Sequence, residues 1–124
     1  MVVAVDSSTL IAFIQGEQGG DVDTFDAALG GNIVLPPVVL TEILSDPKLP
    51  EQHREMLLAF PLLEPKLDYW QRAAATRSLI LARKLRARLA DTLIAQACID
   101  HDVALITRDK DFRHFARHCG LKLA

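Results

Sequence analysis

The sequence predicts an α/β fold, a three-layer α/β/α sandwich built around a mainly parallel sheet. Short apolar runs alternate with longer helical patterns along the whole chain, and this alternation is typical of βαβ units. The first run, residues 2–5, is apolar at every position, as expected of a strand that is buried on both faces. In sheets of this kind, ligands bind beyond the carboxyl ends of the strands.

The first part of the chain predicts a strand, two helices and a second strand. After the strand at residues 2–5, the Asp-Ser-Ser sequence at 6–8 supplies side-chain oxygens that can cap a helix beginning near Thr9. A glycine-rich segment ends that helix, and residues 21–29 predict the next one. Two glycines and an asparagine then precede the apolar run at 33–35, which predicts the second strand.

The middle of the chain predicts mainly helices. The Pro-Pro pair at 36–37 ends the second strand and suits the first position of a short helix over 38–45. Residues 51–59 predict another helix, and the pair at 62–63 a short strand. Residues 67–89 predict one long helix, because their alanine content favours it.

The last part of the chain returns to the alternating pattern. A helix is predicted from residue 90 to residue 101, followed by a strand at 103–107. Residues 111–118 predict a further helix and 121–123 a final short strand. Strands therefore alternate with helices at both ends of the chain.

Composition limits the classes of function. The chain has 124 residues, half of them hydrophobic, which is enough for one domain over residues 1–124. The net charge of −2 gives no general attraction to nucleic acids or to membrane surfaces. The first apolar run is too short for a signal peptide or a membrane span, so we expect a cytoplasmic protein. A polyanion would have to be held by a local cationic patch.

Four carboxylates stand where predicted strands end or predicted helices begin: Asp6, Glu42, Asp91 and Asp109. Taken singly, the three aspartates suit helix caps or the positive end of a helix dipole. Glu42 has apolar neighbours on both sides, and a carboxylate beside an apolar face needs a partner, of which an arginine is the ordinary one. Asp6 and Asp109 both follow strands, so a parallel sheet can bring all four acids together.

Carboxylates brought together repel one another, and a bound cation is the best explanation for such a cluster. Oxygen ligands suit Mg²⁺ or Mn²⁺, whereas zinc would call for histidine or cysteine. We expect Asp6, Asp91 and Asp109 to bind the metal, with Glu42 and Asp111 as further candidates, directly or through water. A metal-activated water can then cleave a phosphodiester bond while one acid orients or deprotonates it.

The motifs around these acids are Val-Asp6-Ser-Ser-x-Leu, Glu42, Ala-Asp91-Thr-Leu-Ile-Ala and Leu-Ile-Thr107-Arg-Asp109-x-Asp111-Phe112. Over essentially the whole chain they resemble the PIN domain family, and within it the VapC-type toxins of bacterial and archaeal toxin–antitoxin pairs. The resemblance implies a small endoribonuclease that needs Mg²⁺ or Mn²⁺. It also implies a homodimer, inhibition by a cognate antitoxin protein, and products with a 5′-phosphate and a 3′-hydroxyl.

Residue by residue, the acidic quartet of the family falls on Asp6, Glu42, Asp91 and Asp109. Some relatives place the last acid two or three residues later, so Asp111 shares or replaces the role of Asp109 in one interpretation. Family members often carry a glycine shortly before the third acid, and this chain has Arg-Ala-Arg-Leu-Ala at 86–90 instead.

A local cationic patch is present just before Asp91. It predicts contacts to RNA phosphates, and a solvated helix face is the alternative. Its members are Arg83, Lys84, Arg86 and Arg88. Thr107 and Ser7 are candidates for hydrogen bonds to the scissile phosphate or to metal-bound waters, with capping and turn roles as the alternative.

Two other functions share parts of this pattern. A non-catalytic, PIN-like regulatory or scaffold protein would normally have lost some of the acids, whereas all four positions are acidic here. A phosphatase-like or receiver-type domain would also have an acidic pocket at a parallel sheet. It would need a lysine near the last strand, and Lys110 is poorly placed for that role.

Overall fold

The computed structural model describes residues 2–124. Its sheet has three strands, β1 (Val3–Val5), β2 (Ile33–Val34) and β3 (Ala104–Ile106), in the order β2-β1-β3. Both pairings are parallel, as predicted. The segments predicted as strands at 62–63 and 121–123 instead form single parallel bridges, Leu62 with Leu35 and Leu123 with Leu105. Only one residue of each segment pairs, so the two bridges extend the edges of the sheet without adding full strands.

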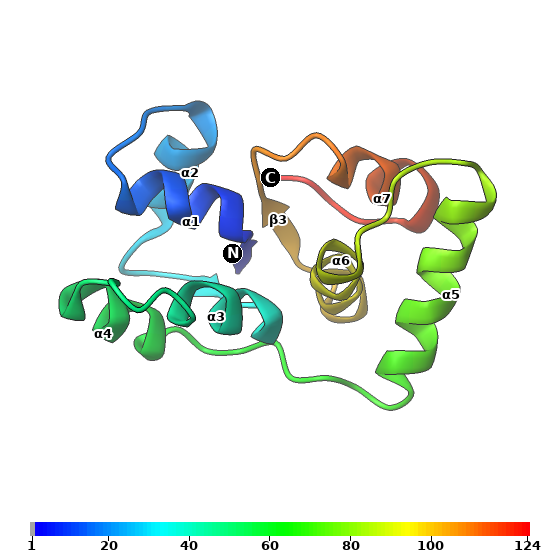
Figure 1. Cartoon of the computed structure of the whole chain (residues 1–124), viewed down its shortest axis with the longest axis horizontal. Helices are drawn as coiled ribbons and strands as arrows, with labels where there is room; N and C mark the ends of the chain where they lie inside the picture. The colour runs from blue at the N-terminus through cyan, green and yellow to red at the C-terminus, as the bar shows by residue number, and fades with distance from the viewer. Residues whose placement is uncertain (1) are drawn as a thin grey trace.

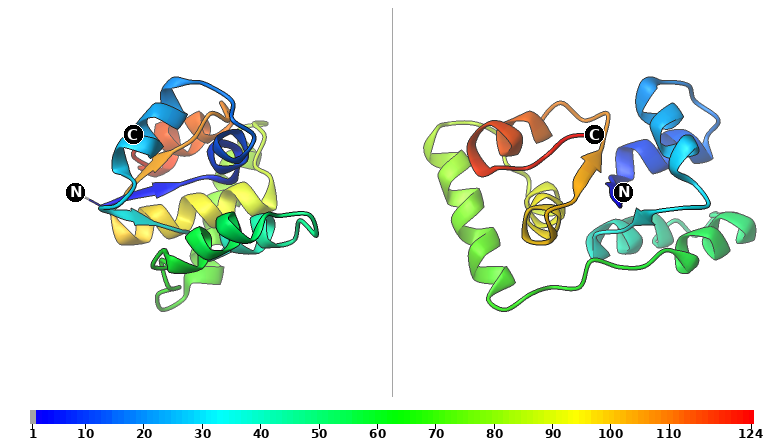
Figure 2. Two further views of the ribbon diagram at one scale, coloured as in Figure 1. Left: turned by 90° about the vertical axis from the view of Figure 1, so that its left-hand side faces the viewer. Right: turned by 180° about the vertical axis from the view of Figure 1, so that it is seen from behind.

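Seven helices surround this sheet in the described part of the chain. They are α1 (Ser7–Ile14), α2 (Gly20–Ala28), α3 (Pro37–Leu44), α4 (Glu51–Ala59), α5 (Tyr69–Ala82), α6 (Leu89–His101) and α7 (Phe112–Cys119). Figure 1 and Figure 2 show α5 at the outer side of α6, and α4 beside α3. The predicted α/β fold with a parallel sheet is therefore confirmed. None of the helices in residues 2–124 is long and apolar enough to cross a bilayer.

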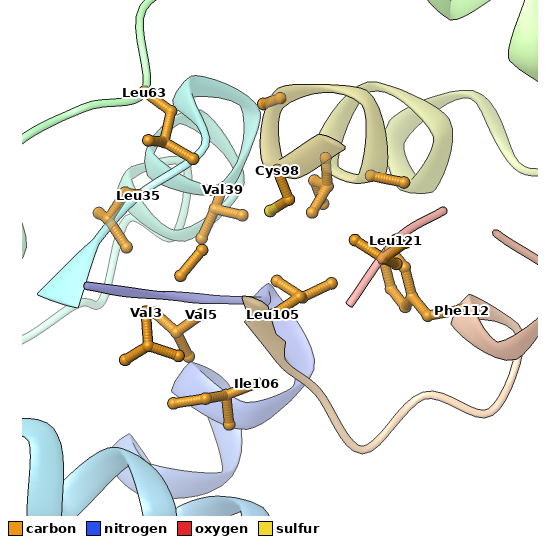
Figure 3. Packing of buried hydrophobic residues seen from close by; sticks show 14 of the residues in the cluster. Val3, Val5, Leu35, Val39, Leu63, Cys98, Leu105, Ile106, Phe112 and Leu121 are labelled. Carbon is orange, nitrogen blue, oxygen red and sulfur yellow. The ribbon is translucent and has the colours of Figure 1, made fainter. Parts of the chain in front are cut away.

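The core explains why β1 is apolar at every position. Figure 3 shows Val3 and Val5 on the face of the sheet toward α1 and α2, together with Ile106 of β3. On the opposite face, Val39 and Cys98 lie on α3 and α6, and all five of these side chains are buried. Helices thus cover both faces of the central strand, which leaves its carboxyl end as the place where polar groups can gather.

The prediction of one helix over residues 67–89 was wrong, because α5 ends at Ala82. Lys84 adopts a left-handed backbone conformation with φ 61°. The Leu85 N–H donates to the Ile80 carbonyl (3.3 Å) and the Lys84 N–H to the Leu81 carbonyl (2.9 Å), which is the Schellman pattern of a helix end. Glycine usually occupies this position, so the lysine at 84 concealed the helix end in the sequence.

Candidate active site

The parallel pairing of β1 with β3 places the two strand-end motifs side by side. Val5 lies opposite Ile106, and the backbone N–H of Asp6 donates to the Ile106 carbonyl at 2.9 Å. Asp6 is only 3% exposed, and burial raises the pKa of its carboxyl above the usual value. Although Asp6 occupies the N-cap position of α1, its side chain makes no capping hydrogen bond there.

Thr107 connects the two motifs. Its hydroxyl donates to Asp6 Oδ2 at 2.8 Å and accepts the backbone N–H of Asp109 at 3.0 Å. The Ser8 hydroxyl donates to the same Asp6 oxygen at 2.7 Å. Asp109 Oδ1 accepts the backbone N–H of Asp111 at 2.9 Å, which shapes the turn into α7. These bonds hold Asp6 and the Asp109 turn together. The Thr107 hydroxyl, a candidate for a hydrogen bond to the scissile phosphate, here donates its proton to Asp6 instead.

Three of the acids approach one another closely. Asp91, in the first turn of α6, has a carboxylate oxygen within 4.8 Å of oxygens from Asp109 and Asp111, and those two are equally close to each other. Burial raises the pKa of Asp91 to about 6, with further increases from the charges of Asp109, Asp6 and Glu42 and an opposing effect from Arg88. Asp6 and Glu42 lie outside the close trio, and they act on Asp91 only through their charge.

Asp91 also carries the least satisfied polar atom of the site. Its Oδ2 is buried and has no hydrogen-bond partner among residues 2–124. A buried charged oxygen without a partner is costly, and buried carboxylates are ordinarily paired or bound to a metal. The position of Asp91 in the first turn of α6 suits the helix dipole, but it gives this oxygen no hydrogen-bond donor. An oxygen-only cluster with one unpartnered, buried oxygen fits a hard divalent cation.

Glu42 borders apolar side chains, as expected, but it is not buried among them. Its side chain is exposed on α3, and its Oε1 accepts the Ser7 hydroxyl at 2.7 Å. No ion pair with Glu42 occurs in the described residues, so the arginine partner considered from the sequence is not found there. The helix turns the neighbouring Val39 and Ile43 into the core and leaves Glu42 at the surface. Glu42 is outside the trio of Asp91, Asp109 and Asp111.

The four cations before Asp91 lie on a loop between α5 and α6, so they do not form a helix face. All four side chains are exposed, while Leu85 and Ala87 between them pack inward. One of the cations reaches the acids, since Arg86 Nη1 lies 3.8 Å from Asp111 Oδ2. The loop therefore presents positive charge directly beside the acidic cluster.

The residues of this site follow the pattern of a known family. Residues 3–118 match the family model described as the PIN domain. The chain belongs to the PIN domain family. Membership supports the general class of nuclease, whose PIN members use divalent metals, and argues against the phosphatase-like and receiver-type alternatives. No curated protein sequence matches the chain.

Solved structures with the same fold come from several bacteria. One is VapBC2 from Rickettsia felis bound to a DNA fragment from its promoter, with a TM-score of 0.76, 19% identity, and coverage of 100% of this chain and 98% of that one. DNA-bound VapBC from Salmonella typhimurium has a TM-score of 0.72 and 15% identity, and the match covers 100% of this chain and 98% of that one. VapBC-5 from Mycobacterium tuberculosis has a TM-score of 0.68 and 20% identity, and the match covers 98% of this chain and 96% of that one. At these identities the comparison establishes the PIN fold.

Sequence reasoning missed one set of contacts beside the site. Arg108, inside the last motif, pairs with Asp21 at the start of α2, and Asp21 also accepts a hydrogen bond from Thr9 of α1. Asp21 was predicted only as the beginning of a helix. No local spacing signals a pair whose members are 87 residues apart.

Proposed function

We propose that this protein is an Mg²⁺- or Mn²⁺-dependent endoribonuclease that acts as the toxin of a toxin–antitoxin pair, in one PIN domain over residues 1–124. The observation that carries the proposal is the buried, unpartnered Oδ2 of Asp91 within 4.8 Å of two other acids. The PIN fold and the motifs around the acids support the same conclusion.

Asp91 and Asp109 are the residues proposed to hold the cation, with Asp111 beside them and Asp6 completing the site from β1. Asp6 is oriented by the hydroxyls of Ser8 and Thr107, which leaves its other carboxylate oxygen for the cation or one of its waters. When bound, the cation supplies positive charge to the phosphoryl oxygens and makes a bound water more acidic.

The chain's own residues then account for the remaining needs of hydrolysis. Glu42 is the acid proposed to accept a proton from the attacking water, because it is exposed, is oriented by Ser7 and lies outside the trio. The water oxygen bonds to phosphorus while the bond from phosphorus to the 3′ oxygen breaks. The 3′ oxygen takes up a proton, which gives a 3′-hydroxyl and a 5′-phosphate.

RNA is proposed to lie across the loop between α5 and α6. The net charge of the chain is −2, so binding of a polyanion depends on this local patch. The contact of Arg86 with Asp111 supports the proposal that the scissile phosphate binds next to the positive patch. Its other members are Arg83, Lys84 and Arg88.

The solved neighbours are VapBC complexes, and we propose that this chain also has a protein antitoxin. An apolar groove of about 220 Å³ lies between α1 and α3, lined by Ile11, Ile14, Ile43 and Leu49 and bordered by Glu42. An antitoxin segment in this groove would lie beside Glu42. Replacing Ile11 by arginine should weaken co-purification with a co-expressed antitoxin. Leu58→Arg, on the exposed side of α4, is the control and should not. Equal binding by both variants would remove the groove from the proposal.

A homodimer is proposed through the outer faces of α5 and α6. Trp70, Leu81 and Leu89 are large, exposed apolar residues, and Leu89 lines two adjoining hollows, one with Trp70 and the other with Leu81. Arg77 lines both hollows as well, so the surface is apolar with one charged residue within it. Large exposed apolar patches are typical of protein interfaces. Sedimentation of the wild type and of Leu89→Lys should give a dimer and a monomer, and a monomeric wild type would refute the proposal.

The activity is tested with purified protein and RNA in Mg²⁺, Mn²⁺ or EDTA. Cleavage should require a divalent cation, and replacement of any one acid by alanine should abolish it; the acids are Asp6, Glu42, Asp91 and Asp109. Asp23→Ala, which removes an exposed acid from the first turn of α2, is the matched control and should cleave normally. Full activity of Asp6→Ala would refute the site. A folded wild type that binds RNA without cleaving it would favour the non-catalytic scaffold alternative.

A further inference from the structure

The side chain of Arg108 contacts the segment before α2, although Arg108 lies between Thr107 and Asp109 in the chain. Its Nε donates to Asp21 Oδ2 at 2.9 Å and its Nη2 to Asp21 Oδ1 at 3.0 Å, a bidentate pair. Nη2 also donates to the Gln18 carbonyl at 3.1 Å, and Nη1 lies 3.6 Å from Glu17 Oε1. The guanidinium is thus occupied by contacts with the segment that leads into α2.

The acid of this pair is itself tied to the element that carries Asp6. The Asp21 side chain is 11% exposed, and its Oδ2 accepts the hydroxyl of the buried Thr9 at 2.8 Å. Thr9 lies in the first turn of α1, which begins directly after Asp6. A closed path of contacts therefore runs from Asp6 through α1, Asp21 and Arg108 to Asp109.

The ion pair is charged at the pH of a cell, because an aspartate and an arginine are both ionised there. The hydrogen bonds from Arg108 hold the pKa of Asp21 below its usual value, at about 2. The Arg108 side chain is 31% exposed, so the pair is partly shielded from solvent.

Gly19 gives the pair the space that it needs. A Cβ at this position would lie 2.6 Å from Asp21 Oδ1 and 2.8 Å from Arg108 Nη2, so any larger residue would push the two side chains apart. Both contacts are to the ends of flexible side chains, so they move the ion pair rather than the backbone. Arg108 and Asp21 can therefore form this ion pair only if residue 19 has no side chain. Gly19 also has φ 156°, which adds backbone strain to any substitution and makes a second glycine with positive φ necessary as a control.

We propose that the Arg108–Asp21 ion pair is a clamp that sets the position of Asp109 relative to Asp6. Arg108 is a positioning residue in this scheme, and it does not contact the RNA. The clamp rests on the proposed nuclease function for its purpose, since it holds the turn that carries one of the metal-binding acids. Groups that orient metal ligands in this way typically contribute about 10- to 100-fold to metal affinity or activity.

A double-mutant cycle on the full-length protein tests the clamp. Arg108→Ala and Asp21→Ala should each lower Mn²⁺ affinity and the kcat for RNA cleavage by about 10- to 100-fold, with KM for RNA unchanged. The double variant should lose no more than either single one, because both remove the same interaction. Exchange of the partners, Arg108→Asp with Asp21→Arg, should restore part of the affinity. A raised KM in Arg108→Ala alone, with Asp21→Ala unaffected, would show that Arg108 binds RNA and would overturn the proposal.

A glycine comparison separates the clamp from general strain. Gly19→Ala should reproduce the loss of Mn²⁺ affinity. Gly16→Ala is the matched control, because Gly16 also has a positive φ, 74°, but no atom lies within 4 Å of its added Cβ. Gly16→Ala should leave Mn²⁺ affinity unchanged, and equal losses in the two variants would overturn the proposal.

Amide hydrogen exchange of the metal-free protein distinguishes failure of the clamp from failure of the nuclease assignment. The Asp109 and Asp111 amides, which donate to Thr107 Oγ1 and Asp109 Oδ1, should exchange at least about 10-fold faster in Asp21→Ala, while the amide of Leu105 in β3 stays protected. This result would support the clamp even if the wild type cleaved no RNA. Unchanged exchange at both amides would overturn the clamp even in an active nuclease.

Discussion

Replacing Asp91 by asparagine should stabilise the metal-free protein at high pH and not at low pH. The carboxyl of Asp91 has a folded-state pKa of about 6, against its usual value near 3.8, because it is buried among other acids. The difference is about two pH units, and about 1.4 kcal/mol per unit gives an upper limit of roughly 3 kcal/mol. Asp91 keeps some contact with solvent, which reduces the expected penalty to about 1–2 kcal/mol.

The sign follows from proton binding in the two states. Below about pH 4 Asp91 is protonated both folded and unfolded, so its ionisation costs nothing. Between about pH 4 and pH 6 the unfolded chain releases the proton while the folded protein retains it, so the free energy of unfolding falls as the pH rises. Above pH 6 the full penalty is present, and only the asparagine variant avoids it.

Urea unfolding in EDTA at pH 4 and pH 8 measures this effect. The free energy of unfolding of Asp91→Asn relative to wild type should be about 1–2 kcal/mol more favourable at pH 8 than at pH 4. The control Asp23→Asn, at an exposed position, should show no such change. Added Mg²⁺ should stabilise the wild type at pH 8 and not Asp91→Asn. A difference between variant and wild type that is the same at both pH values would refute the reasoning.

The remaining predictions concern the turn, the loop and the end of α5. Asp109→Asn should abolish RNA cleavage while Asp111→Asn keeps part of it; the reverse result in a cleavage assay would assign the fourth acid to Asp111. Changing the loop cations together to glutamine should weaken RNA binding for all sequences and flatten its salt dependence; these cations are Arg83, Lys84, Arg86 and Arg88. Titrations from low to high salt measure this dependence, and an unchanged slope would mean that RNA binds elsewhere. Lys84→Gly alone should raise the free energy of unfolding by about 0.5–1 kcal/mol in urea, because glycine relieves the left-handed backbone strain, and a loss of stability would contradict the helix-end assignment.

Local patterns were sufficient to predict the class of fold and the strand ends at which Asp6 and Asp109 stand. An apolar run that suits a strand buried on both faces is visible in a few consecutive residues, and so is its end at Asp6. Parallel pairing then places the ends of β1 and β3 side by side without further information, which is why Asp6 and Asp109 could be expected at one edge of the sheet. The nearness of Asp91 to Asp109 agrees with the same expectation, since α6 packs on that sheet.

Only the tertiary structure decided the features that depend on contacts between distant residues. The helix over 67–89 stops at Ala82 because Leu85 packs back on the core, although Lys84 is a residue type that rarely ends a helix this way. Glu42 has apolar neighbours in sequence but is exposed in space, because helical geometry turns those neighbours to the other side. The Arg108–Asp21 pair joins residues 87 positions apart. Side chains so far apart meet only once the sheet and helices are assembled, so no pattern of neighbouring residues encodes their contact.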